Sequence, residues 1–158
     1  MEGVEIERKF LLLNETYKSE AFKKERIIQG FLSSVPERTV RIRLIAGIGF
    51  ITVKGIGNAS GTTRFEWEKE ISKKEAERLL QICETGIIDK VRYFVKAGVH
   101  IYEIDEFALD NQGLVLAEIE LTNEDESFEK PDWLGEEVTG QTKYYNSSLV
   151  KKPFRDWK

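Results

Sequence analysis

Charged side chains occupy alternate positions in several short segments of this chain, and most of these segments carry one sign of charge. The like-charged pairs are Glu5 and Glu7, Arg41 and Arg43, Lys90 and Arg92, and Glu118 and Glu120. Alternate residues of a β-strand point to the same face of a sheet, so each pair is predicted to share one face. Like charges placed in this way repel each other slightly. The arrangement therefore favours a ligand that uses both charges of each pair.

The two signs of charge suit the two parts of one ligand. Arginine forks bind phosphate oxygens bidentately and lysines supply point charges, as a linear polyphosphate requires. The basic set consists of Arg41, Arg43, Lys54, Lys90 and Arg92. The acidic set consists of Glu5, Glu7, Glu118 and Glu120. These carboxylates have no role in binding a bare anion, but Mg²⁺ takes one or two carboxylates together with substrate phosphates. Together the two sets indicate a site for a metal ion and a triphosphate.

An ordinary half-exposed sheet, apolar inside and charged outside, is the competing interpretation. The solvent face of such a sheet normally mixes charged residues with Thr, Ser, Gln and Asn, whereas these faces are almost purely Glu or purely Arg and Lys. In residues 4–10, for example, one face holds only charged residues, Glu5, Glu7 and Lys9, while the other face is mainly apolar. We therefore expect an inverted barrel, with a charged interior and an outer face covered by helices.

Eight segments of period two, bounded by turn residues, are predicted to be the strands that position these side chains. They span residues 3–13, 27–34, 38–46, 49–56, 63–72, 90–96, 99–107 and 113–122. Helices are predicted over residues 15–24, 72–84 and 141–150, and the second begins with a capping box formed by Ser72 and Glu75. This pattern predicts a mainly β (α+β) fold, an eight-stranded antiparallel closed tunnel barrel with a charged lumen and a few flanking helices. Closure is favoured because it removes exposed sheet edges.

The composition limits the class of protein. A length of 158 residues predicts a single domain over residues 1–158. A net charge of -4 argues against a nucleic-acid partner, because phosphate binding favours a basic chain. The single cysteine excludes an intrachain disulfide, and the sequence carries neither a signal peptide nor a run of about 18 apolar residues. We therefore expect a cytoplasmic protein with no membrane partner.

The charged pairs belong to a longer ordered set of motifs. Residues 5–9 read Glu-Ile-Glu-Arg-Lys, which is the ExExK signature of the CYTH superfamily, also called the triphosphate tunnel metalloenzymes. The other matching segments are Gln29-Gly30-Phe31-Leu32, Arg41-x-Arg43, Lys54, Arg64-x-Glu66-x-Glu68, Lys90-x-Arg92, Asp105, Glu118-Ile119-Glu120 and Val138-Thr139-Gly140 to Tyr144. They follow the family's order over nearly the whole chain, so the protein resembles this family.

The resemblance implies roles for individual residues. The implied metal ligands are Glu5, Glu7, Asp105, Glu118 and Glu120, with Mg²⁺ or Mn²⁺ as the cofactor. The implied substrate-binding residues are Lys9, Arg41, Arg43, Lys54, Arg64, Lys90, Arg92 and Lys143. The implied catalytic residues are Glu5, Glu7, Lys9, Glu118 and Glu120, while Glu66 and Glu68 are expected to line the tunnel.

Three functions remain open at this point. The first is metal-dependent hydrolysis of inorganic tripolyphosphate to pyrophosphate and phosphate, with ATP and thiamine triphosphate as further substrates to consider. The second is a class IV-type adenylate cyclase that makes cyclic AMP from ATP. The third is a non-catalytic polyphosphate-binding module, which the acidic pairs argue against because binding alone needs only the basic set. The expected partner is a small-molecule triphosphate, and a homodimer is left open.

One tryptophan and one acidic stretch are predicted to have no part in the chemistry. Trp67 is predicted to pack under a helix, and the acidic stretch Glu124–Glu129 is predicted to be a solvated loop and not a metal site.

Overall fold

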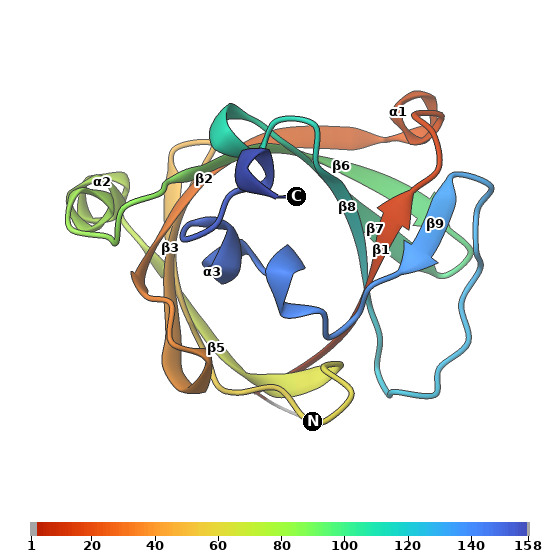
Figure 1. Cartoon of the computed structure of the whole chain (residues 1–158), viewed down its shortest axis with the longest axis horizontal. Coiled ribbons are helices and arrows are strands. Elements are labelled where there is room, and N and C mark those ends of the chain that lie inside the picture. The colour runs from red at the N-terminus through yellow and green to blue at the C-terminus, as the bar shows by residue number, and fades with distance from the viewer. Residues whose placement is uncertain (1–2, 158) are drawn as a thin grey trace.

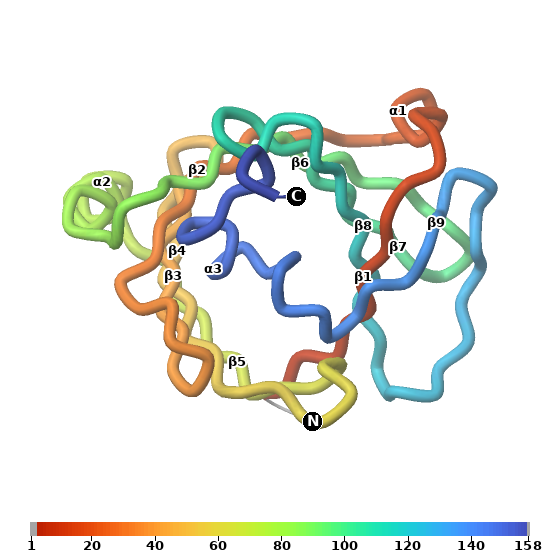
Figure 2. The backbone as a smooth tube through the Cα atoms, in the orientation of Figure 1, coloured from red at the N-terminus to blue at the C-terminus, as the bar shows by residue number. Residues whose placement is uncertain are grey.

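Eight antiparallel strands form a closed barrel in the computed structural model, which describes residues 3–157. The strands are β1 (Val4–Leu12), β2 (Lys23–Ser33), β3 (Thr39–Ile45), β4 (Ile48–Lys54), β5 (Thr63–Ile71), β6 (Ile88–Ala97), β7 (His100–Phe107) and β8 (Val115–Glu120). Their order is β5-β4-β3-β2-β6-β7-β8-β1, and pairing of β5 with β1 closes the ring (Figures 1 and 2). The predicted barrel is confirmed.

Strand β1 closes the barrel because it pairs with a different neighbour at each end. Its first residues pair with β5, where Glu5 lies opposite Arg64. Its later residues pair with β8, where Glu7 lies opposite Glu120 and Lys9 opposite Glu118. The period-two alternation of the sequence thus sends the charges of both ends of β1 toward the barrel axis.

A ninth strand, β9 (Leu134–Glu137), is absent from the sequence-based prediction. It pairs with the end of β1, where Leu134 lies opposite Leu12. The two backbones come close at Gly135, because a Cβ atom there would lie 2.8 Å from the carbonyl oxygen of Leu11. Only glycine fits such an approach without displacing the neighbouring strand.

The helices are shorter than the sequence predicts. Helix α1 covers only Tyr17–Glu20, and the rest of the predicted helix 15–24 is wrong because β2 already begins at Lys23. Helix α2 (Lys73–Gln81) has the predicted capping box, in which Ser72 and Glu75 each accept from the other's backbone N–H. The predicted helix 141–150 is a 3₁₀ turn, Thr142–Tyr144, followed by α3 (Asn146–Leu149).

Further 3₁₀ turns span Pro36–Arg38, Leu109–Asn111 and Phe154–Asp156. The chain after β9, which contains α3, lies across the barrel opening that faces the viewer in Figure 1. None of the helices in the described part of the chain is long and apolar enough to cross a membrane.

Apolar side chains pack on the outside of the barrel wall. One core cluster joins Tyr17 of α1 to Tyr102 of β7 and to Trp133, which stands beside β9, with Trp133 in edge-to-face contact with both tyrosine rings. Helix α2 packs on β4, where Gly49 leaves room for Ala76.

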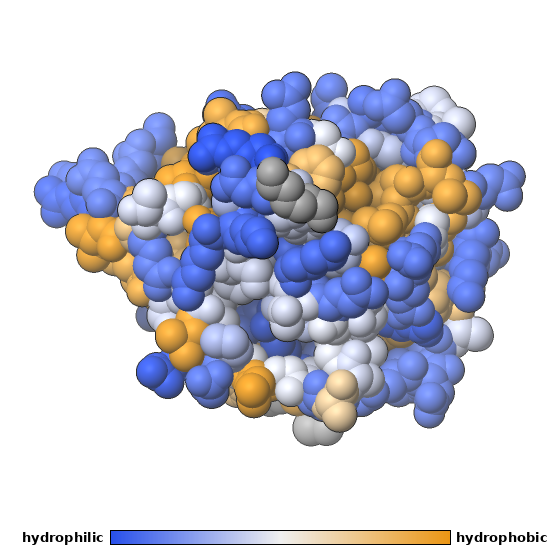
Figure 3. Space-filling model, in the orientation of Figure 1, coloured by the Kyte–Doolittle hydropathy of each residue, from blue (hydrophilic) through white to orange (hydrophobic). Residues whose placement is uncertain are grey.

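The outer cover is incomplete. The prediction that Trp67 packs under a helix is wrong, because its side chain is 47% exposed on β5. Apolar residues reach the surface in patches among mostly hydrophilic ones, as Figure 3 shows for one face.

Candidate active site

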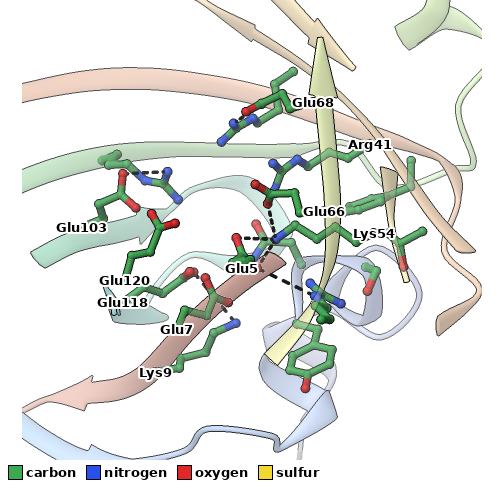
Figure 4. A pocket seen from close by; sticks show the side chains of 18 of the residues that line it. Glu5, Glu7, Lys9, Arg41, Lys54, Glu66, Glu68, Glu103, Glu118 and Glu120 are labelled. Atoms are coloured by element: carbon green, nitrogen blue, oxygen red, sulfur yellow. Dashed lines mark hydrogen bonds and ion pairs between the residues drawn. The ribbon is translucent and has the colours of Figure 1, made fainter. Parts of the chain in front are cut away.

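The barrel encloses a cavity of about 240 Å³ whose wall is almost entirely charged or polar. Of the thirteen charged residues predicted as catalytic, substrate-binding or metal-binding, eleven line this cavity. They are Glu5, Glu7, Lys9, Arg41, Arg43, Lys54, Arg64, Lys90, Arg92, Glu118 and Glu120. The remaining two, Asp105 and Lys143, do not line it. Glu66 and Glu68 lie on the wall as expected (Figure 4).

One end of the acidic group is built by β1 and β8. Burial, together with the charges of Glu118 and Glu5, raises the pKa of Glu7 well above its usual value. Burial also opposes ionisation of Glu118, but the charge of Lys9 and a hydrogen bond from Glu7 outweigh it and hold the pKa of Glu118 well below its usual value. The Nζ atom of Lys9 lies 3.9 Å from Glu118. Of these two carboxyl groups, Glu7 therefore holds a proton to higher pH than Glu118 does.

The other end of the acidic group is built by β1, β4 and β5. Lys54 Nζ donates to both carboxylate oxygens of Glu5, at 2.8 and 3.1 Å, and lies 3.4 Å from Glu66. Burial and a hydrogen bond to Glu5 raise the pKa of Glu66 to about 7. In spite of burial, the charge of Lys54 lowers the pKa of Glu5. In this pair, Glu66 holds its proton to higher pH than Glu5 does.

The basic side of the cavity contains arginine N–H groups that have no hydrogen-bond acceptor within residues 3–157. Arg41 Nη2 donates to Thr52 at 3.2 Å, and Arg43 Nη2 donates to Glu68 at 2.8 Å. The buried Nε atoms of both arginines have no hydrogen-bond partner within residues 3–157. Burial, and then repulsion by Arg43, lower the pKa of Arg41 to about 10, so it stays cationic at neutral pH. Buried unpartnered donors are costly, and phosphate oxygens would satisfy them.

Asp105 is paired with two cations of the barrel wall. Its carboxylate accepts two hydrogen bonds from Arg92, at 2.7 and 2.9 Å, and lies 2.8 Å from Lys90 Nζ. Asp105 is only 1% exposed. These two cations hold its pKa at about 2 in spite of burial. Asp105 therefore anchors two residues of the basic set and is not among the residues that line the cavity, and its role as a metal ligand stays a prediction.

Lys143 also lies away from the cavity. It is exposed, and its ammonium group packs over the rings of Tyr144 and Trp157, 5.1 and 4.7 Å from their centroids. It lines an outer, partly apolar groove instead of the tunnel. The substrate contact of Lys143 that the resemblance implies stays a prediction, and this arrangement of the chain does not form it.

This placement gives a direct comparison of two cations. Lys143→Ala is expected to leave kcat/KM for tripolyphosphate within about twofold of the unmodified protein, because no tunnel contact is lost. Arg41→Ala is expected to lower the same constant by about 100-fold or more, because it removes a buried phosphate-facing donor. Steady-state phosphate release from both variants checks this, and a large loss in Lys143→Ala would restore the original assignment.

Sequence reasoning missed several residues of the cavity wall, including Glu103, Tyr145 and Asn146. Glu103 could have been found, because it precedes Asp105 by two residues on a strand and so shares its face. Its nearest cationic partner is Arg92, at 3.4 Å. Tyr145 and Asn146 belong to an irregular segment whose sequence has no period, so only the tertiary structure places them.

Tyr145 contributes an aromatic surface beneath two cations. The ammonium of Lys9 and the guanidinium of Arg64 lie 5.1 and 5.5 Å from the centre of its ring. Cation–π contacts of this kind hold the two cations at one end of the cavity.

The acidic residues fit a divalent cation by their chemistry. No group of three acidic, histidine or cysteine side chains in residues 3–157 is already arranged as a metal site. Glu7 and Glu66 nevertheless have raised pKa values inside one cavity, where a hard cation would displace protons and relieve the repulsion between carboxylates. The residues that would hold it are Glu5, Glu7, Glu118 and Glu120.

Metal binding is accordingly expected to release protons. Because the pKa of Glu66 is about 7 and that of Glu7 is raised well above its usual value, a metal ion competes with protons for both carboxyl groups. The affinity for Mn²⁺ should therefore fall as the pH is lowered from 8 to 6. Calorimetry in two buffers of different ionisation enthalpy measures the proton release. Glu66→Gln should release fewer protons, and equal binding heats in both buffers would contradict the assignment.

The barrel and its lumen, with cations on one side and carboxylates on the other, define a tunnel protein for a metal-bound anion. The model of the CYTH domain matches residues 3–153, and this chain belongs to the CYTH family. Membership of this family of tunnel metalloenzymes implies a divalent metal.

Known proteins similar to this chain include an inorganic triphosphatase of Acetivibrio thermocellus, 43% identical over 99% of both chains. An inorganic triphosphatase of Nitrosomonas europaea is 34% identical over 92% of this chain and 96% of its own length. The crystal structure of an inorganic triphosphatase superimposes with a TM-score of 0.66 at 31% identity, over 92% of this chain and 96% of that one.

Proposed function

We propose that this protein hydrolyses inorganic tripolyphosphate to pyrophosphate and phosphate inside the barrel, with Mg²⁺ or Mn²⁺ as the cofactor. The observation that carries the proposal is that Arg41 and Arg43 line the same cavity as the carboxyl groups of Glu5, Glu7, Glu118 and Glu120. The names of the similar proteins support the same activity.

The basic residues bind and orient the substrate in this proposal. Arg41 and Arg43 donate to phosphate oxygens, while Lys90 and Arg92, anchored by Asp105, present fixed charge beside them. Such preorganised donors stabilise the charge that develops on the transferred phosphoryl group. A bound divalent cation would neutralise charge on the leaving pyrophosphate.

The hydrolytic step forms one bond and breaks one. The oxygen of a water molecule bonds to the terminal phosphorus as the bridging P–O bond breaks, and the electron pair leaves with pyrophosphate. The proton of the water passes to a carboxylate of the Glu5–Glu7 or Glu118–Glu120 pair. Every one of these four carboxyl groups lines the cavity, so each lies within the space where the reaction would occur.

One assay tests the proposal against its alternatives. Release of phosphate from tripolyphosphate and from ATP is measured with Mg²⁺ and with Mn²⁺, and cyclic AMP is quantified in parallel. We expect release from tripolyphosphate that is abolished by EDTA. Cyclic AMP as the main product would favour an adenylate cyclase, and tight binding without turnover would favour a polyphosphate-binding module. Thiamine triphosphate belongs in the same comparison.

Other properties stay predictions from the sequence. They are a single domain over residues 1–158, location in the cytoplasm, and the lack of a nucleic-acid or membrane partner. Size-exclusion chromatography with light scattering decides whether the chain forms a homodimer.

A further inference from the structure

Asn146 connects the C-terminal segment to the basic side of the cavity. It is the first residue of α3, and its side chain lines the cavity between those of Tyr145 and Ser147. Its Oδ1 atom accepts two hydrogen bonds, from Lys90 Nζ at 2.8 Å and from Gln29 Nε2 at 2.8 Å. One amide oxygen thus joins α3 to strands β6 and β2.

The orientation of this amide follows from the chemistry of Lys90. A lysine ammonium can only donate, so the oxygen of Asn146 and not its nitrogen must face it. Gln29 must then donate as well, because the same oxygen is its neighbour. Gln29 is fully buried, and its own Oε1 is left without a hydrogen-bond partner in the described part of the chain. Turning both amides would leave one end of the Gln29 amide without a recorded partner as before, and it would also point an N–H group at Lys90. The recorded orientation is therefore the one that keeps the contact with Lys90.

Lys90 is held from two sides by this contact. Asp105 of β7 lies 2.8 Å from its Nζ on the wall side, and Asn146 holds the same atom from α3. Lys90 is 2% exposed and has the ring of Phe107 5.4 Å from its Nζ. An ammonium with an acid on one side alone would be drawn into the wall, toward Asp105 and away from the cavity.

We propose that Asn146 is a positioning residue, which acts through Lys90 and sets where that ammonium meets the phosphate chain. The role of Asn146 rests on the proposed function, because it concerns the substrate of the same cavity. The proposal also links α3 to substrate binding, because Lys90 keeps its position only while Asn146 of α3 is hydrogen-bonded to it.

Two substitutions separate positioning from simple packing. Asn146→Leu keeps the size of the side chain but removes the acceptor, and we expect it to lower kcat for tripolyphosphate by about 10- to 100-fold, as the loss of a supporting contact does at metal sites. Asn146→Asp keeps an oxygen toward Lys90. We expect it to hold kcat within about threefold of the unmodified protein and to raise KM, because the added charge repels phosphate.

Ser148→Ala is the matched control on the same helix, since its hydroxyl lies outside the cavity wall, and it should leave both constants unchanged. Thermal unfolding of all variants shows how much of any loss reflects unfolding. If Asn146→Leu has the kcat of the unmodified protein, or if Asn146→Asp loses as much kcat as Asn146→Leu, the proposal is wrong.

A binding cycle tests whether Asn146 acts through Lys90, without any need for turnover. Tripolyphosphate is titrated calorimetrically in EDTA into the unmodified protein, Asn146→Leu, Lys90→Met and the double variant. We expect Asn146→Leu to weaken binding several-fold in the presence of Lys90 and to have almost no effect in Lys90→Met. Equal effects in both backgrounds would overturn the proposal. Failure of the proposed hydrolysis would instead appear as binding without phosphate release, so the two failures are distinguishable.

Discussion

Glu118→Gln is expected to lower kcat for tripolyphosphate by about 10²–10³-fold, which is the usual loss when one preorganised electrostatic contact is removed from an active site. Glu118 is ionised, because Lys9 and the hydrogen bond from Glu7 outweigh the effect of burial and hold its pKa well below its usual value. An amide at this position has nearly the same shape but can neither carry the charge nor bind a divalent cation as a carboxylate does. Initial rates at saturating Mg²⁺ measure the effect.

A control variant and a folding measurement are needed to interpret the loss of kcat in Glu118→Gln. Glu77→Gln makes the same chemical change at an exposed position of α2 and should leave kcat unchanged. Circular dichroism should show that Glu118→Gln keeps its β structure, because the substitution changes no apolar contact. A Glu118→Gln protein that turns over tripolyphosphate at the normal rate would remove Glu118 from the catalytic group and weaken the case for a metal between β1 and β8.

The alternation of charges predicts which residues face the lumen, but not which partners they meet there. Eleven of the predicted residues line the cavity because period two fixes the face of every strand residue once the strand is recognised. Asp105 obeys the same alternation, yet its direct cross-strand neighbour is Arg92. The carboxylate of Asp105 is therefore ion-paired inside the barrel wall. The strand register determines this partner, and a single sequence does not reveal the register.

Other errors of prediction arise where tertiary pairing overrides local signals. Residues 23–26 carry four charges and resemble a helix end, but they extend β2 because β6 offers them partners along its length, including Arg92 opposite Glu25. Strand β9 has only four residues, and its docking on β1 depends on the close approach at Gly135. Lys143 and Asn146 lie in a segment without a repeating pattern, so their opposite placements could not be separated from sequence.

Asp105→Asn is the second change with a large expected effect, because it removes a buried negative charge that contacts two buried cations. Lys90 would lose its carboxylate partner and Arg92 would keep only Glu103, at 3.4 Å, and breaking a buried pair in this way costs about 3–5 kcal/mol of unfolding free energy. The matched control is Asp89→Asn, which makes the same change in a bidentate pair with Arg26 at the surface and should have a much smaller effect. Urea denaturation at pH 7 measures both.

The pH dependence of this difference tests its electrostatic origin. The folded protein holds the pKa of Asp105 at about 2, below its ordinary value of 3.8, so the ionised carboxylate stabilises the fold at every pH above about 4. That contribution is lost as the pH falls through 2, because Asp105 is then protonated in both states. The stability gap between the unmodified protein and Asp105→Asn should therefore narrow as the pH falls below 4. A gap of the same size at pH 2.5 would mean that Asp105 acts through packing and not through its charge, and Lys90 and Arg92 would then need another anchor.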